Sequence, residues 1–357
     1  MAETMRAIVK TAPGRGAQLQ EVPKPVPVDG EALIRVVSAS ICGTDHHIYE
    51  WNEWAERRIG PHIPQIMGHE LCGVVEEVGQ GVSNVSEGDF VSAETHIVCH
   101  ECIPCSRNQH HVCLNTKILG VDIDGAFADY IVVPAGNLWK NPPDLDPRVA
   151  SALEPLGNAV HTATIEPLAG RQVLVIGAGP IGLFAVGVAR VTGASEIIVS
   201  EPNAYRLELA GRMGADHLID PTEVSLVEAV GDITGNGVDA VLEMSGHPQA
   251  IRDAIFSTIP GGHIAQLGLP PGDVSIDLNE LIFRGIRFYG IVGRQIWETW
   301  ETMSGLMSEG GLDITPVLTQ TFDLESFEEG INLMDEGTCG KVVLSVSQRD
   351  QQLKPQD

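Results

Sequence analysis

The chain has 357 residues, of which 43% are hydrophobic, and this size and composition are typical of a soluble globular protein with two domains. Asp and Glu number 48 against 22 Lys and Arg, and the formal net charge of −26 argues against nucleic acid or an anionic membrane as a partner. The sequence has no apolar run of about 18 residues and no signal-peptide core at its start, so it predicts a cytoplasmic protein without a membrane span.

The first 154 residues are rich in short β-type runs that are separated by glycine-containing turns. Examples are ALIRVVSASIC, LCGVVEEVGQGV and GDFVSAE. Runs of this length with frequent turn residues predict an all-β domain over residues 1–154, in the form of a partly closed barrel with loops.

After residue 154 the pattern changes to apolar strands that alternate with amphipathic runs such as AYRLELAGRMG. Six strands with helical crossovers predict a doubly wound parallel sheet over residues 155–294, so the fold class is α/β, a Rossmann domain beside a β-rich one. Residues 295–357 return to helix and short strand, close with a strand at GKVVLSVS, and end in QRDQQLKPQD, which we expect to be frayed. The predicted parallel strands are 172–177, 196–200, 216–219, 238–243, 263–268 and 286–291.

The first of these strands leads into the glycine-rich run GAGPIG, which opens a helical stretch. This context indicates a dinucleotide site, because glycines allow a tight turn and let the backbone approach a pyrophosphate at the helix N-terminus. A carboxylate at the end of the second strand accepts hydrogen bonds from a ribose and repels a 2′-phosphate, which favours NAD over NADP. The alternative is a glycine turn that only packs a helix on a strand. The predicted cofactor contacts are Gly177, Gly179, Pro180, Ile181, Gly182, Glu201 and Arg206.

Four of the seven cysteines lie close together, with the spacing C-x2-C-x2-C-x7-C at Cys99, Cys102, Cys105 and Cys113. Such clustering favours reduced metal ligands over a disulfide framework, and four thiolates make a closed structural zinc site. An iron–sulfur cluster is the alternative. Its usual cysteine run places the fourth cysteine after three residues and a proline behind it, whereas here Leu114 follows the fourth cysteine.

A second set of metal-ligand residues is scattered over the chain. Cys42 lies in SICGTDHH, His69 and Glu70 lie in IMGHELCG, and Glu154 lies in ALEPLG. A thiolate, an imidazole and a carboxylate that leave one position open describe a catalytic zinc site. Taken singly, each of these residues has an ordinary structural role as its alternative.

These motifs, together with GAFADYIVVP, resemble the zinc-dependent medium-chain alcohol dehydrogenases from about residue 5 to residue 347. The segments HIYEWNEWAERRI, ETHIVCHECIPC, EPLGNAVHTA and GRQIWETW are similar to the branch of that family that oxidises L-threonine. The resemblance implies a GroES-like catalytic domain, a Rossmann NAD-binding domain and a homotetramer. It also implies oxidation of the secondary hydroxyl of L-threonine to 2-amino-3-oxobutanoate, with NAD as the hydride acceptor.

The resemblance also implies roles for individual residues. Thr44 and His47 fall where the family passes a proton to water, and His96 falls near the substrate in the threonine-oxidising branch. The implied ligands are Cys42, His69, Glu70 and, directly or intermittently, Glu154 for a catalytic zinc, and Cys99, Cys102, Cys105 and Cys113 for a structural zinc.

Two alternatives remain at this point. One is an NAD(P)-dependent polyol, 2,3-butanediol or sugar dehydrogenase of the same family, and the other is a zinc-stabilised nucleotide-binding protein without catalysis. The acidic surface with only six lysines is the main departure from typical family members. It predicts a halophilic protein, for which an ordinary acidic protein is the alternative.

Overall fold

The computed structural model describes residues 3–347 and divides them into two compact units. The first unit holds the described residues up to Glu154, the segment Leu318–Glu336 and the described residues from Lys341 onward; the second holds Pro155–Val317 and Gly337–Gly340. Residues 295–317, which we expected in the C-terminal segment, therefore lie in the second unit. The tail QRDQQLKPQD, expected to be frayed, lies outside the described residues.

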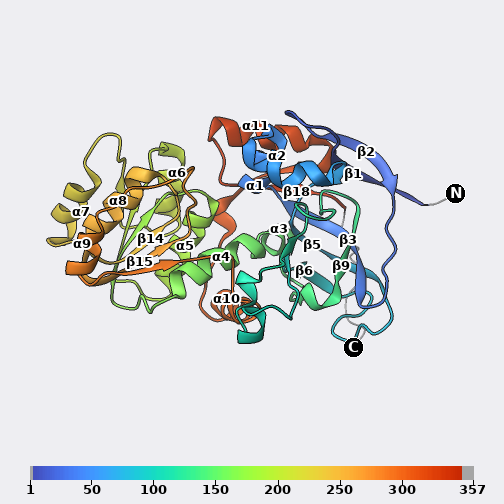
Figure 1. The fold of residues 1–357 in the computed structure, drawn as a ribbon, viewed down its shortest axis with the longest axis horizontal. Coiled ribbons are helices and arrows are strands. Elements are labelled where there is room, and N and C mark those ends of the chain that lie inside the picture. The colour runs from blue at the N-terminus through green and yellow to red at the C-terminus, as the bar shows by residue number, and fades with distance from the viewer. Residues whose placement is uncertain (1–2, 348–357) are drawn as a thin grey trace. The chain divides into compact units, whose positions relative to one another are not determined.

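The first unit is built on a seven-stranded sheet with the order β10-β6-β5-β3-β18-β17, and β9 also pairs with β3 (Figure 1). Its middle strand β3 is almost entirely buried, as a strand covered on both faces must be. The predicted C-terminal strand is β18, which inserts between β3 and β17. The strands are β3 (Glu31–Ser40), β5 (Glu70–Val78), β6 (Phe90–Ala93), β9 (Tyr130–Pro134), β10 (Leu138–Lys140), β17 (Leu318–Asp323) and β18 (Lys341–Ser345).

Two small sheets complete this unit, one with the order β2-β1-β4 and one made of β7 and β8. Their strands are β1 (Thr4–Lys10), β2 (Gln18–Pro23), β4 (Gln65–Ile66), β7 (His96–Ile97) and β8 (Lys117–Ile118).

The prediction of an all-β first domain is wrong in one respect, because the unit also contains helices. Two of them, α1 and α2, follow β3 directly; they are short, and α1 carries so many polar residues that it lacks a clear apolar stripe. The helices are α1 (Gly43–Glu50), α2 (Glu53–Ile59), α3 (Pro147–Ser151), α11 (Phe327–Glu336) and the short 3-10 turns η1 (Gly60–His62), η2 (Cys105–Arg107), η3 (His110–Val112), η4 (Ala135–Asn137) and η6 (Leu324–Ser326).

The second unit is a parallel six-stranded sheet with the order β13-β12-β11-β14-β15-β16, which is the doubly wound order that the sequence predicts. The inner residues of its central strands, such as residues 173–175, are apolar and buried because helices cover the sheet (Figure 1). The strands are β11 (Gln172–Ile176), β12 (Glu196–Ser200), β13 (His217–Ile219), β14 (Val238–Glu243), β15 (Thr258–Gln266) and β16 (Arg287–Gly290). The helices are α4 (Leu153–Thr164), which begins in the first unit, α5 (Pro180–Val191), α6 (Ala204–Arg212), α7 (Leu226–Thr234), α8 (Pro248–Ser257), α9 (Leu278–Phe283), α10 (Glu298–Ser308) and the turn η5 (Thr315–Val317).

The helices of residues 3–347 are all too short or too polar to cross a membrane. The longest helices of the described residues, α4 and α5, have 12 residues each, well below the roughly 20 that span a bilayer.

Candidate active site

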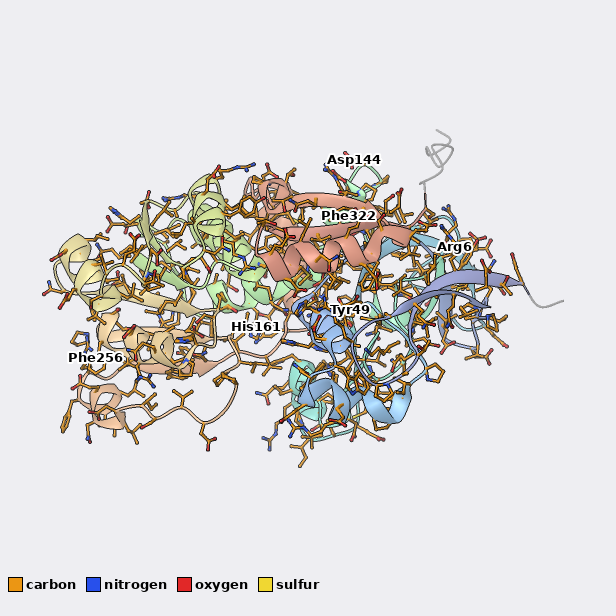
Figure 2. All side chains as sticks on the ribbon, turned by 90° about the horizontal axis from the view of Figure 1, so that it is seen from above. Arg6, Tyr49, Asp144, His161, Phe256 and Phe322 are labelled. Atoms are coloured by element: carbon orange, nitrogen blue, oxygen red, sulfur yellow. The ribbon has the colours of Figure 1, made fainter. Side chains whose placement is uncertain are left out.

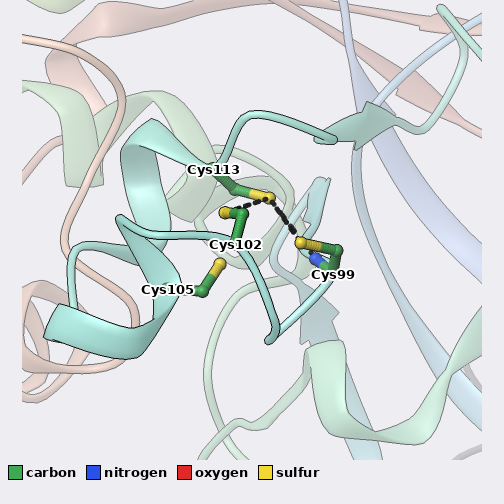
Figure 3. Close-up of side chains that lie close together, drawn as sticks. All are labelled: Cys99, Cys102, Cys105 and Cys113. Carbon is green, nitrogen blue, oxygen red and sulfur yellow. Dashed lines mark hydrogen bonds between the residues drawn. The ribbon is translucent and has the colours of Figure 1, made fainter.

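The four clustered cysteines converge in the loop between β7 and β8 (Figure 3). The Sγ atom of Cys113 lies 3.5 Å from that of Cys99 and 3.8 Å from that of Cys102, and Cys105 completes the group. Four thiolates around a zinc at about 2.3 Å have sulfurs roughly 3.8 Å apart, so the spacing fits a tetrahedral zinc site. With four protein ligands, such a site leaves no position for a substrate.

Cys99 and Cys105 differ in acidity because their surroundings differ. Backbone contact with Glu101 and the side-chain amide of Asn115 lower the pKa of Cys99 to about 6. Burial, with added contributions from the neighbouring thiols, raises the pKa of Cys105 to about 12. A metal binds the thiolate form, so the low pKa of Cys99 favours the form that binds zinc, and loading the site releases protons.

The second predicted set also comes together. The ligand atoms of Cys42, His69 and Glu70 all lie within 4.8 Å of one another. The sheet explains this, because Ser40 at the end of β3 pairs with Glu70 at the start of β5, so the residues just beyond both strands meet at one edge. Gly68 makes the turn before His69: its φ is +92°, and a Cβ there would lie 2.2 Å from the ring of Phe127.

His69 has a buried carboxylate beside it that sequence reasoning missed. Asp45 is fully buried; one oxygen accepts a hydrogen bond from Cys42 N at 2.9 Å, and the other lies 3.4 Å from Nδ1 of His69. Burial lowers the pKa of His69, but the charges of Asp45 and Cys42 outweigh burial and raise it well above its usual value. A carboxylate behind an imidazole fixes the ring and makes it a better metal ligand. The sequence signal for Asp45 is the spacing CGTD, which places an aspartate at the third position of the helix that follows Cys42.

Both carboxylate oxygens of Glu70 accept hydrogen bonds from buried groups of the protein. Its carboxylate accepts hydrogen bonds from the buried Nζ of Lys341, at 2.6 Å, and from the hydroxyl of Ser40. Burial raises the pKa of Glu70, Lys341 opposes this shift, and the negative charge of Glu154 adds to it. Glu154 is buried at the start of α4, yet it does not belong to the compact group of three ligands.

The helix α1 carries the two residues predicted to move a proton. Thr44 and His47 are three residues apart on α1, so they lie on one side of it, and His47 is exposed. Partial covering of the ring, and then the neighbouring His46, lower the pKa of His47. The Nε2 atom of the neighbouring His46 lies 2.5 Å from a carboxylate oxygen of Asp335 in α11.

A second contact anchors α1 on α11. Tyr49, which is labelled in Figure 2, lies near the end of α1. Its hydroxyl donates a hydrogen bond to Glu328 at 2.9 Å, and its ring packs edge-on against Phe327. Both ends of this contact lie in the first unit. The position of the two predicted proton-transfer residues is therefore fixed from the C-terminal half of the chain.

His96 lies in β7, at the base of the cysteine loop. Its backbone N donates to the fully buried Glu94 at 2.9 Å, and its ring Nδ1 lies 3.6 Å from the same carboxylate. The amide of Asn137 donates to the carbonyls of both residues, at 2.8 and 2.9 Å. Hydrogen bonds therefore fix the backbone of His96, and the strand pair that contains it also closes the cysteine loop.

The glycine-rich run lies in the second unit, between β11 and α5. Gly182 is required, since a Cβ there would lie 1.9 Å from the carbonyl of Gly177, whereas a Cβ on Gly179 would meet open space. A pocket of about 510 Å³ opens at this point, lined by Gly177, Gly179, Glu201 and Arg206 among others. Pro180 and Ile181 form the first turn of α5 beside it.

Glu201, the acidic residue of this pocket, already accepts hydrogen bonds from the protein backbone. Glu201 accepts hydrogen bonds from the backbone of Ala178 at 2.7 Å and of Asn203 at 3.0 Å. Its carboxylate is thereby fixed at the carboxyl end of the sheet, where ligands bind in this fold. The Nε atom of Arg206 is buried without a hydrogen-bond partner, which is the condition of a group that awaits a ligand. The open cradle and these two side chains fit a dinucleotide.

Comparison with known proteins shows the family to which the chain belongs. Two family models match it, the alcohol dehydrogenase GroES-like domain over residues 28–143 and the zinc-binding dehydrogenase over residues 180–309. The L-threonine 3-dehydrogenase of Pyrococcus horikoshii is 53% identical over 346 residues, which cover 96% of this chain and 99% of that protein. This chain belongs to the zinc-binding alcohol dehydrogenase family.

Solved structures agree with this assignment. A short chain alcohol dehydrogenase of Escherichia coli CFT073, complexed with NADH, matches with a TM-score of 0.88 and 29% identity, over 96% of this chain and 99% of that chain. The 2R,3R-butanediol dehydrogenase of Bacillus subtilis matches with a TM-score of 0.86 and 26% identity, over 96% and 100%. The family prediction is confirmed. The dehydrogenase uses zinc and a nicotinamide cofactor, and the two cysteine-containing sites and the glycine cradle fit them.

Proposed function

We propose that this dehydrogenase oxidises the secondary hydroxyl of L-threonine to 2-amino-3-oxobutanoate, with NAD as the hydride acceptor. The observation that carries the proposal is the near full-length identity to an L-threonine 3-dehydrogenase, about twice the identity to the butanediol enzyme. The compact set of Cys42, His69 and Glu70 supports it, because three donors leave a fourth position for a hydroxyl. A nucleotide-binding protein without catalysis has no use for such a set.

Zinc, when bound, lowers the pKa of the substrate hydroxyl, and NAD accepts the hydride from its carbon. Within the chain, Cys42, His69 and Glu70 are the proposed zinc ligands, with Glu154 as a direct or intermittent fourth. Asp45 holds His69 in orientation from behind. The cysteine loop binds the structural zinc and keeps β7 in place.

The proton of the hydroxyl leaves through α1 in this proposal. Thr44 accepts and donates through its hydroxyl, and His47 takes the proton as a neutral imidazole and passes it to water. The exposure of His47 supports the second step, because only a ring in contact with solvent can release its proton directly. His96, held by Glu94, is the proposed contact to the polar groups of the amino acid.

The proposal includes a homotetramer, for which the second unit offers a surface. Strand β16 is the last strand of its sheet, so one of its edges has no strand paired to it within the described residues. Large apolar side chains lie exposed on and before it, including Phe283 at 86%, Ile282 at 63% and Phe288 at 40%. An open edge with such side chains favours pairing with a second copy. A cytoplasmic location remains a prediction.

The test is a substrate panel with the purified, zinc-loaded enzyme and NAD, read as NADH formation. L-Threonine should be oxidised with a kcat/KM at least about a hundredfold above those of 2-butanol, 2,3-butanediol, sorbitol and glucose, because a site built for an ammonium and a carboxylate rejects alcohols that lack them. His96→Ala should lower kcat/KM for L-threonine and leave the zinc content unchanged. If a diol or a sugar exceeds L-threonine, the substrate assignment fails and the family assignment stands.

A further inference from the structure

Lys341 is a buried cation in a chain that has only six lysines. It is 2% exposed, and its Nζ donates to Glu70 Oε1 at 2.6 Å and to the carbonyl of Ile41 at 2.9 Å. Nζ also lies 2.5 Å from the other carboxylate oxygen of Glu70. Removing a lysine from water costs several kcal/mol unless it is paired and hydrogen-bonded, so a lysine in this place needs a reason.

The topology of the sheet brings this lysine to the metal ligands. Strands β5 and β18 flank β3 on its two sides, and the end of β3 leads to Cys42. Ile41 N donates to Val342 O at 3.0 Å, which aligns the start of β18 with the end of β3. Glu70 at the start of β5 and Lys341 at the start of β18 therefore meet across the last residues of β3.

The ammonium group of Lys341 offsets negative charge at the candidate zinc site. The thiolate of Cys42 and the carboxylates of Glu70 and Glu154 all act on Lys341, each favouring its charged form. Together these three groups exceed the charge of a divalent zinc by one negative charge. Lys341 cancels that excess among the groups nearest the metal, and the buried Asp45 behind His69 adds one further negative charge that Lys341 does not offset.

The hydrogen bonds of Glu70 have a second consequence. One oxygen accepts from Lys341, and the other accepts from the hydroxyl of Ser40 while it also lies near Lys341. A carboxylate with donors on both oxygens is a weaker metal ligand than a free one, because binding the metal means giving up or stretching these bonds.

We propose that Lys341 is a positioning residue that holds the Glu70 carboxylate back from the metal and so keeps one coordination position available to the substrate. Of the three proposed ligands, Cys42 and His69 are then constant, whereas Glu70 is a weakly bound ligand that can yield its place on the metal, as Glu154 can. This inference rests on the proposed function, because it assigns Lys341 a part in zinc-assisted oxidation.

The test compares holoenzymes that carry Lys341→Met, which is one atom shorter and removes the charge, and Lys341→Arg, which keeps the charge. In the methionine variant Glu70 should close on the metal. The catalytic zinc should then leave to a chelator about tenfold more slowly, a size typical of changes beside metal ligands. The enzyme with cobalt in place of the catalytic zinc should show an absorption spectrum that no longer changes on adding L-threonine, and KM should rise. The arginine variant should stay close to the wild type.

Two further variants keep the test decisive. Lys341→Met combined with Glu70→Gln should bring zinc release back toward the wild-type rate, because the group that closes the site has lost its charge. If Lys341→Met does not fold, Ser40→Ala removes one of the same donors and should slow zinc release in the same direction, by less. Release of the structural zinc is the internal control and should not change.

The proposal is overturned if zinc release and the cobalt spectrum of Lys341→Met match the wild type, even if its thermal stability falls, because that result describes a purely structural ion pair. Faster zinc release in Lys341→Met also overturns it. A wild-type enzyme that fails to oxidise L-threonine sinks the proposed function, whereas the zinc-release rates and the cobalt spectrum without substrate still decide the role of Lys341.

Discussion

At the scale of single residues, the pH dependence of the enzyme depends on His47, the proposed proton acceptor. Partial burial, followed by the charge of His46, lowers the pKa of His47, so the neutral ring that accepts a proton persists below the usual value of 6.5. The acid limb of kcat/KM against pH should therefore lie below that value. His46→Gln removes the neighbouring charge and should move this limb to higher pH. A limb that stays in place or moves to lower pH would show that His47 is not the group that titrates.

The preference for NAD depends on Glu201 at the end of β12. Its carboxylate is fixed by the backbone of Ala178 and Asn203, and it faces the position of the adenosine ribose in this fold. A 2′-phosphate there meets like charge, so kcat/KM with NAD should exceed that with NADP by at least about tenfold. Glu201→Ala should lower the ratio of kcat/KM with NAD to that with NADP, because Arg206 remains to attract the 2′-phosphate. A wild-type preference for NADP would contradict this account of the pocket.

At the scale of elements, the loop between β7 and β8 should behave as a structural module. Cys102→Ser removes one of four sulfurs from a site whose metal binding is coupled to folding, so the free energy of unfolding should fall by about 2 kcal/mol or more. The kcat of the remaining folded enzyme should change little. Thermal unfolding, zinc content and turnover measure the three effects. Cys72→Ser is the matched control, because a serine can make the same hydrogen bond to Pro147 without touching the loop. A stable variant with both zincs but no turnover would refute the structural role.

Elements differ in how far the sequence predicts them. The six parallel strands were predictable to within a few residues, except that β15 begins at Thr258, because strands buried on both faces are uninterrupted apolar runs. The helices α1 and α2 were not predictable, because they are short and carry many polar residues, some of which lie at the candidate active site. Asp45 and Lys341 were missed for a related reason. Lys341 reaches its partner Ile41 across 300 residues, and only the insertion of β18 beside β3 shows it.

At the scale of the whole molecule, surface charge sets the solvent conditions that the fold prefers. Even if every one of the 22 Lys and Arg were paired, 26 of the 48 acidic groups would have no basic side chain to pair with. Their mutual repulsion opposes the compact state and acts over a Debye length of about 10 Å at 0.1 M salt, which shrinks to about 3 Å at 1 M. Salt also weakens surface pairs such as Arg6 with Asp129, but each exposed pair contributes only about 1 kcal/mol or less.

Repulsion should therefore dominate, and screening it should stabilise the protein. The melting temperature should rise as KCl or NaCl is increased from 0.1 M to about 2 M, and the activity should hold or increase over the same range. Matched measurements in sucrose provide the control, since sucrose stabilises by exclusion and does not screen charge. If the rise in melting temperature appears with salt at concentrations where sucrose has no effect, the net charge is its cause. Maximal stability at low salt would refute the halophile prediction and leave the assignment as a zinc-binding dehydrogenase unchanged.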